Sequence, residues 1–323
     1  MAIKFGTFVP QGWRMDLVEI SDPVEKYEAM TRVGKIAEEV GYDSVWVYDH
    51  FHTVPTPEIE SVFEAWTATA GLARDTSRIR LGQMVTCNGY RNPALLAKIA
   101  STIDVMSHGR AICGLGAGWY EHEWRAYGYG FPEVPDRMKA FREAVEIVVK
   151  MWTEEKATFK GSYYSIDGAI NEPKGVQRPH LPLWLGGGGE QVTLKLVAKH
   201  GDGSNFGSGK PDQFKQKYDI LAGHCQTLNR DINTITRSTN LNTILIEDGA
   251  DPVKASALAR GNASYEEYLT GGFIGTAAQL TERIEQLIAV GANYLITYFP
   301  RVAYDQTMLR RFASEIMPKF MAK

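Results

Sequence analysis

The sequence predicts a (β/α)8 TIM barrel, formed as a single domain over residues 1–323. Short β-branched runs alternate with longer stretches of helical period, and eight such strand–helix units follow one another. Eight units in a chain of 323 residues are typical of this barrel. The alternative is a doubly wound open sheet, in which a glycine fingerprint follows the first strand. Here the glycine turn Gly114-Leu115-Gly116-Ala117-Gly118 follows the fourth strand, and this position favours the barrel.

The first four units are regular. In the first helix, apolar residues such as Tyr27, Met30, Val33 and Ala37 recur at three- and four-residue spacing, and Gly41 follows as a plausible helix stop. Proline in the first turn supports the start of the third helix. Strands are expected at residues 3–9, 43–48, 79–85 and 111–115, and helices at 24–40, 61–74, 93–106 and 137–152.

The second half resumes the alternation after an interruption. Loop-rich stretches at 119–136 and 157–182 predict insertions after strand four and before strand five, and the second contains a hairpin that turns at Lys160-Gly161. Strands then follow at residues 183–185, 203–206, 236–246 and 294–299, and helices at 191–200, 212–228, 276–290 and 306–317. Because the insertions interrupt the barrel without dividing it, we expect no domain boundary.

Composition excludes several function classes. A net charge of −3 provides no basic field for nucleic acid or an anionic membrane. Three widely spaced cysteines, with no CxxC pair, argue against a disulfide framework or a structural zinc site. The first residues lack the pattern of a signal peptide, and no apolar stretch reaches membrane-spanning length. We therefore expect a soluble cytoplasmic protein.

The active site of a parallel barrel lies at the carboxyl ends of its strands, so the residues at those ends are the candidates for catalysis and binding. The second strand ends in Asp49-His50, where an imidazole beside a carboxylate can move protons near neutral pH, although a polar capping loop is the simpler reading. His52 forms a His-x-His pair with His50, which is a possible metal-binding pattern. Later strand ends supply no suitable further ligands, so no metal is expected. The fifth strand ends in four glycines, residues 186–189, whose N–H groups precede a helix and favour an anion. Lys210 is a second candidate anion contact, with a solvated loop lysine as the equal alternative.

Several stretches combine in a recognisable order. They are residues 41–51 (GYDSVWVYDHF), 80–86 (RLGQMVT), 90–98 (YRNPALLAK), 104–110 (DVMSHGR), 114–119 (GLGAGW) and 185–190 (LGGGGE). Together they cover most of residues 3–210 and resemble the bacterial-luciferase-like flavin and deazaflavin oxidoreductases. The RNPA segment and the GGGGE turn are most similar to the branch that uses coenzyme F420.

This resemblance implies an oxidoreductase that transfers a hydride between deazaflavin C5 and a small organic substrate, with His50 as proton donor or acceptor. Met84-Val85 matches the third-strand position where the family often holds a non-prolyl cis peptide against the ring. The implied cofactor-binding residues are Asp49, Met84, Val85, Thr86, Cys87, Asn88, Ala117, Gly118, Gly187, Gly188, Gly189 and Glu190. FMN is the alternative cofactor, in a monooxygenase served by a separate flavin reductase. A barrel that binds flavin without catalysis is a third reading.

One departure from the family concerns the substrate. Sugar-phosphate dehydrogenases of this branch carry a glutamate at or just after the glycine turn, where this chain has Ala117, Gly118 and Trp119, with Glu121 and Glu123 further on. Oxidation of a sugar phosphate is therefore not expected, and an aromatic residue there suits a flatter substrate. The expected substrate-binding residues are Gln11, Trp13, Trp46, Trp119 and Tyr120. The resemblance also implies a homodimer that pairs through the helices of the second and third units.

Overall fold

A computed structural model describes residues 3–207 and 209–321 of the chain. Eight parallel strands close into a barrel, because the sixth and seventh strands also pair with each other. In chain order the barrel strands are β1 (Lys4–Phe8), β2 (Ser44–Val47), β3 (Arg80–Gln83), β5 (Ala111–Gly116), β8 (Leu183–Gly186), β9 (Gly203–Asn205), β10 (Thr236–Leu245) and β12 (Tyr294–Tyr298). The predicted fold class is confirmed.

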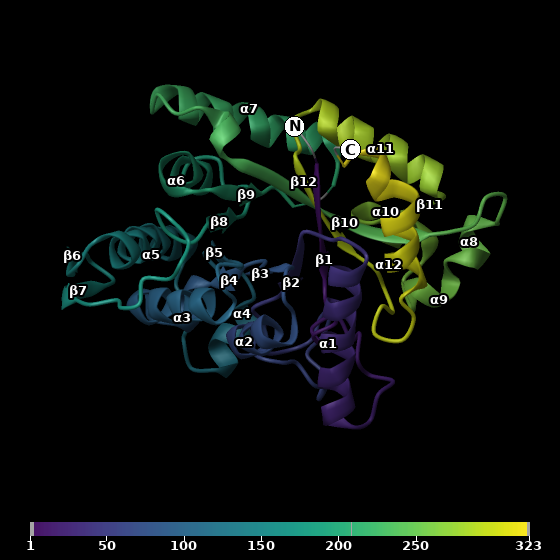
Figure 1. Cartoon of the computed structure of the whole chain (residues 1–323), viewed down its shortest axis with the longest axis horizontal. Helices are drawn as coiled ribbons and strands as arrows, with labels where there is room; N and C mark the ends of the chain where they lie inside the picture. Colours follow the sequence, from purple (N-terminus) through teal and green to yellow (C-terminus); the bar gives the residue numbers. More distant parts are fainter. Residues whose placement is uncertain (1–2, 208, 322–323) are drawn as a thin grey trace.

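A helix follows each barrel strand. These helices are α1 (Pro23–Glu39), α2 (Ala65–Asp75), α3 (Pro93–Met106), α5 (Val134–Thr153), α6 (Thr193–His200), α7 (Pro211–Thr227), α11 (Ala277–Ala289) and α12 (Thr307–Arg311). Figure 1 shows α1, α2 and α3 along one side of the barrel and α6, α7 and α11 along the opposite side. Within the described ranges, no helix is long and apolar enough to cross a lipid bilayer.

The second and last predicted helices differ most from the structure, and α5 also begins at Val134 instead of residue 137. The second helix begins at Ala65 instead of residue 61, because the Glu64 side chain accepts hydrogen bonds from the backbone N–H groups of Trp66 and Thr67 and so caps it. The last helix does not run to residue 317: after Arg311 the backbone forms a π-helical turn, Phe312–Ile316, and then a short 3-10 turn.

Two of the insertions lie at opposite ends of the view in Figure 1, and another lies nearer the middle. The predicted hairpin is present as β6 (Ala157–Lys160) and β7 (Ser165–Ala169), and the first insertion contains α4 (Glu121–Ala126). A third insertion, after β10, was not predicted. It contains three short helices, α8 (Pro252–Ala255), α9 (Ala257–Arg260) and α10 (Tyr265–Gly271). Two further short strands extend the sheet, β4 (Thr86–Cys87) after β3 and β11 (Phe273–Gly275) after α10.

Two apolar clusters lie on the two faces of the barrel strands. Alternate residues such as Val45 and Val47 pack outward against the helices, whereas Trp46 packs inward with Trp184, with ring centres 4.9 Å apart. Glycine makes room for these indoles: a Cβ at Gly82 would lie 2.4 Å from the Trp46 ring. The interior of the barrel is therefore a packed aromatic core, and the site must lie above it.

Candidate active site

A cavity of about 460 Å³ lies at the carboxyl ends of the barrel strands. This size is ordinary for a small-molecule site. It is lined by many of the residues that the sequence predicted, namely Trp13, Asp49, His50, Met84, Val85, Thr86, Cys87, Ala117, Gly118, Trp119, Gly187 and Gly189. The structure therefore brings residues from five strand ends to one cavity.

His50 is held in place by a glutamate from the first insertion. The His50 Nδ1 atom lies 2.8 Å from Glu123 Oε2, and the imidazole stacks on the Trp13 indole with ring centres 4.3 Å apart. No described residue bonds to His50 Nε2, and the ring lines the cavity. Because an ionised carboxylate can only accept, Nδ1 carries a proton and Nε2 is left to exchange one with a bound molecule.

Glu123 is itself fully buried and accepts from several donors. Its Oε1 accepts the backbone N–H groups of Phe51 and His52, each at 2.8 Å, and its Oε2 also accepts the Tyr90 hydroxyl at 2.8 Å. Burial opposes ionisation, but the hydrogen bonds from His50, His52 and Tyr90 outweigh it and lower the pKa of Glu123. The carboxylate therefore stays charged beside His50.

Sequence reasoning noted Glu123 shortly after the glycine turn but assigned it no role, because nothing in the local sequence distinguishes it from Glu121. It belongs to α4, a six-residue helix with no amphipathic period. The signal was present in the acidic residues after Trp119, but only the folded loop brings one of them to His50.

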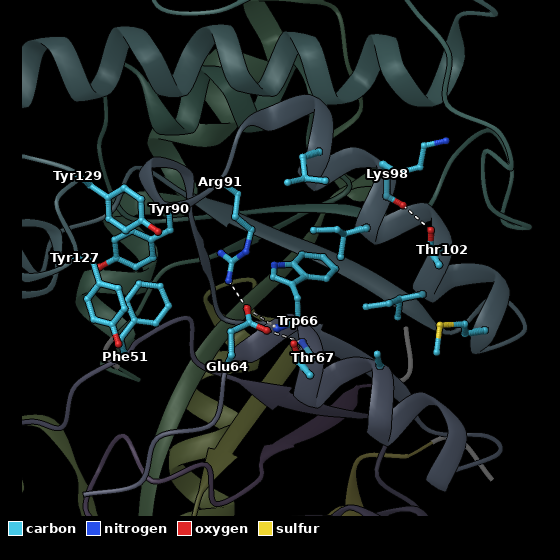
Figure 2. Close-up of a pocket in the computed structure, with 15 residues that line it drawn as sticks. Phe51, Glu64, Trp66, Thr67, Tyr90, Arg91, Lys98, Thr102, Tyr127 and Tyr129 are labelled. Atoms are coloured by element: carbon cyan, nitrogen blue, oxygen red, sulfur yellow. Dashed lines mark hydrogen bonds and ion pairs between the residues drawn. The ribbon is translucent and has the colours of Figure 1, made fainter. Parts of the chain in front are cut away.

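Asp49 supports the site from behind. Its carboxylate accepts hydrogen bonds from both Arg91 Nη atoms, at 2.6 and 2.9 Å, and from the Cys87 backbone N–H, at 2.8 Å. The same guanidinium also bonds to Glu64, as Figure 2 shows. The Asp49 side chain thus ties the end of β2 to β4 while it also lines the cavity, and its contact with a cofactor stays a prediction.

One wall of the cavity is flat and apolar. The Met84–Val85 peptide is cis, as the resemblance implied, and Val85 packs against glycine backbone. A Cβ added at Gly116 would lie 2.6 Å from Val85, and one at Gly186 would lie 2.7 Å away. Bare backbone on both sides of Val85 is the kind of surface that a planar ring system fits.

Cys87 is not a nucleophile in this environment. Burial, with a smaller effect from the Asp49 carboxylate, raises the pKa of the Cys87 thiol to about 12. The thiol packs under Gly118, where an added Cβ would lie 2.4 Å from Sγ. Its role in the cavity is to provide shape.

Six predicted site residues do not line the cavity: Gln11, Trp46, Asn88, Tyr120, Gly188 and Glu190. Gln11 is fully buried, with its amide bonded to the backbone of Tyr48 and Phe63. Trp46 belongs to the barrel core, and Asn88 donates to the Tyr164 hydroxyl.

The remaining three are also engaged elsewhere. Tyr120 donates its hydroxyl to Thr53 O, at 3.2 Å. Glu190 pairs with Lys217, which also lies against Gly188, so only part of the predicted anion turn faces the cavity. Lys210 lines a separate small cavity together with Arg283.

Residues that the sequence analysis did not assign to the cofactor or the substrate complete the lining, although Gly116 and Gly186 belong to the two glycine turns that it identified. They are Arg14, Tyr48, Tyr90, Gly116, Met138, Gly186, Thr193, Asn205 and Asn240. Asn205 and Asn240 were hidden inside strands, where only the register of β9 and β10 brings them side by side, with Nδ2 of Asn205 3.0 Å from Oδ1 of Asn240. Across the described ranges, no group of three or more His, Cys, Asp or Glu side chains could hold a metal ion.

Comparison with known proteins agrees with the fold. The sequence profile of the family described as luciferase-like monooxygenase matches residues 3–292. An F420-dependent glucose-6-phosphate dehydrogenase of Kineococcus radiotolerans is 37% identical over 179 residues, which are 54% of this chain and 50% of that protein. A protein of the same name from Intrasporangium calvum is 29% identical over 87% of this chain and 91% of its own length. The chain spans about half the length of the Kineococcus relative.

Solved structures share the barrel at lower identity. An F420-dependent secondary alcohol dehydrogenase in complex with an F420–acetone adduct has a TM-score of 0.76 and 21% identity, covering 99% of this chain and 98% of its own. The monooxygenase RslO1 from Streptomyces bottropensis has a TM-score of 0.81 and 19% identity, covering 98% and 100%. At these identities the likeness concerns the fold. The family match, which covers most of the sequence, shows that the chain belongs to the luciferase-like monooxygenase family.

Proposed function

We propose that this protein is an F420-dependent oxidoreductase that moves a hydride between deazaflavin C5 and a small organic substrate, with His50 as the proton donor or acceptor. The observation that carries the proposal is the His50–Glu123 pair at the edge of a cavity with a flat glycine and valine wall. The names of the Kineococcus and Intrasporangium relatives support the choice of F420.

The residues present fit such a cofactor. The ring system would lie against Val85, between Gly116 and Gly186, where any side chain in place of these glycines would collide. The phosphate-bearing tail would lie along Gly187 and Gly189, ahead of the first turn of α6, whose N–H groups attract anions. When bound, F420 supplies the hydride chemistry, and the protein supplies placement and electrostatics.

The protein's own contribution to the reaction is proton transfer. His50 Nε2 would protonate the substrate oxygen or carbon that develops negative charge, or remove a proton in the opposite direction. Glu123 stabilises the imidazolium that forms and fixes which nitrogen faces the cavity. The wall formed by Ala117, Gly118 and Trp119 has no carboxylate, which supports a substrate other than a sugar phosphate.

Cofactor titration tests the proposal. F420 is expected to bind more tightly than FMN, measured by fluorescence quenching. H50A is expected to lose about 10²- to 10⁴-fold in kcat with unchanged F420 affinity, because only proton transfer is removed. H122A is the matched control, since His122 lies outside the cavity lining. Tighter binding of FMN, with oxygen-dependent turnover, would instead support the monooxygenase reading.

We also propose that two copies of the chain associate through α2 and α3. An apolar groove of about 700 Å³ runs along these helices, between Trp66 and Met106, and Leu95 on α3 is 54% exposed (Figure 2). An exposed apolar surface of this kind is typical of an interface. The resemblance to the family implies the same pairing.

Charge placed in this groove tests the association. L95E is expected to convert a dimer to a monomer in sedimentation velocity, because association would bury an uncompensated carboxylate. L228E is the control, because Leu228 is similarly exposed at the end of α7. A wild-type protein that sediments as a monomer would contradict the proposal.

A further inference from the structure

Arg14 occupies an unusual position beside the candidate active site. It follows β1, and its guanidinium lies over the Tyr298 ring, 4.3 Å from the ring centre, and 5.5 Å from the centre of the Trp13 ring. It lines the cavity that contains His50 and also a second cavity of about 1070 Å³, whose rim includes the third insertion. Arg14 therefore stands where the two cavities meet.

No described carboxylate forms a direct ion pair with Arg14, although, against the effect of burial, Asp16 lies near enough for its charge to raise the pKa of the guanidinium. Among residues 3–207 and 209–321, no acidic oxygen lies within ion-pair distance of its guanidinium, and its one hydrogen bond goes to Asn242 Oδ1 at 3.2 Å. Asp16, two residues along, accepts the Gly12 N–H at 2.7 Å instead. A guanidinium has five N–H donors, so most of those of Arg14 are left for a bound molecule.

The aromatic surroundings of Arg14 add further unused donors. In the described structure the buried Trp13 Nε1, Tyr48 hydroxyl and Tyr268 hydroxyl have no hydrogen-bond partner. Trp13 and Tyr48 are 8% and 6% exposed and line the His50 cavity, whereas Tyr268 lines the second cavity. Buried polar groups are normally paired in a folded protein. A cation with several unpaired donors and aromatic walls is suited to an anionic oxygen on a flat apolar body.

We propose, resting on the function proposed above, that Arg14 binds a carboxylate of the substrate and so selects planar organic carboxylates. The carboxylate would bind the Arg14 guanidinium, which lies over the Tyr298 ring, and the substrate body would contact the edge of Trp13, whose ring face stacks on His50. The reacting group of the substrate would then reach His50. The planar guanidinium fork matches the two oxygens of a carboxylate. Arg14 is thus a specificity-determining residue.

The charges of the second cavity favour a carboxylate over a phosphate ester. Arg301, another cation there, is already paired with Glu19, at 2.5 and 3.0 Å. Arg260 is bonded to Ser256 and to backbone carbonyls of its own loop. Three further acidic side chains line the same cavity: Asp16, Glu58 and Glu60. A single unpaired guanidinium near these acids suits a monoanion better than a dianion.

Binding of three flat probes tests the assignment. Cinnamate, cinnamamide and phenyl phosphate share an aromatic body but differ in charge. We expect F420-loaded protein to bind cinnamate about 10- to 100-fold more tightly than cinnamamide, the usual value of charge-assisted hydrogen bonds, and more tightly than phenyl phosphate. Calorimetric titration measures all three.

Variants then assign the preference to Arg14. R14Q is expected to abolish the preference for cinnamate, R14K to retain only part of it, and R301Q, in the same cavity, to retain all of it. Equal binding of cinnamate and cinnamamide to wild-type protein, absence of cinnamate binding, or an unchanged preference in R14Q would overturn the proposal. Tighter binding of phenyl phosphate would overturn it in favour of a phosphate ester.

The same titrations with cofactor-free protein keep the two proposals separate. A carboxylate preference that depends on Arg14, in a protein that fails to bind F420, contradicts the proposed cofactor and leaves the role of Arg14 intact. Binding of F420 without any carboxylate preference contradicts the role of Arg14 and leaves the proposed cofactor intact.

Discussion

Replacing Glu123 with glutamine is expected to lower kcat by about 10²- to 10⁴-fold, the usual contribution of a positioned acid–base group, while F420 affinity stays unchanged. Glutamine can still accept the Phe51 and His52 N–H groups through its oxygen. Its amide nitrogen then faces His50 Nδ1 and donates to it, which moves the imidazole proton to Nε2. Nε2 of the neutral His50 would still face the cavity, but it would carry the proton and could no longer accept one from the substrate.

The pH dependence of stability provides a second measurement for E123Q. The pKa of Glu123 lies below its ordinary value of 4.5, so the ionised carboxylate stabilises the folded state above about pH 4.5. This contribution is lost as the pH falls through the lowered pKa. The difference in unfolding free energy between wild type and E123Q is therefore expected to be largest at neutral pH and to shrink in acid.

Glu121 offers a matched control on the same helix. Its carboxylate is 54% exposed and pairs with Arg125, so E121Q is expected to change neither kcat nor stability measurably. If E123Q retained full turnover, His50 would not depend on Glu123 for its orientation, and the proposed proton transfer would have to be assigned differently.

Replacing Gly114 with alanine is expected to destabilise the fold by about 3 kcal/mol or more and to weaken F420 binding. A Cβ at this position in β5 would lie 1.8 Å from the Gln83 carbonyl oxygen and 3.2 Å from Val85. Because the obstacle is backbone, β3 must move away, and the wall formed by Val85 moves with it. Urea unfolding and cofactor titration measure the two effects.

Gly223 provides the opposite case. It lies in α7, and nothing would contact a Cβ added there. G223A is therefore expected to stabilise the protein by about 0.5–1 kcal/mol, the helix-propensity difference between the two residues. A G114A variant as stable as wild type would show that the β3–β5 contact adjusts easily and that the glycine is not required.

The barrel could be predicted because its signals are local. The alternation of β-branched runs and amphipathic periods depends only on residues close together in the sequence, so all eight strand–helix units were recognised. The three short helices after β10 escaped because four to seven residues contain too little periodicity. The start of α2 was misplaced because the Glu64 cap competes with helical continuation, and a pattern of apolar residues does not report on caps.

Residues of the site could be predicted where they directly follow a strand. They were missed where only the folded chain brings them to the cavity. His50, Met84 and Val85 stand at strand ends, whereas Glu123 lies on the short helix α4 and Arg14 in the loop after β1, and tertiary contacts set the position of both. Gln11 and Trp46 lie outside the cavity lining for a related reason. An aromatic or amide side chain near a strand end can point into the core or into the cavity, and only the register decides.

The guanidinium of Arg91 connects the cavity at the strand ends with the groove along α2 and α3. On one side it holds Asp49 at the cavity, and on the other it holds Glu64 on the groove along α2 and α3. A substitution of Arg91 would disturb both at once. Because one side chain holds both carboxylates, a change at this position that alters the pocket also alters the groove. The two surfaces therefore cannot diverge independently here.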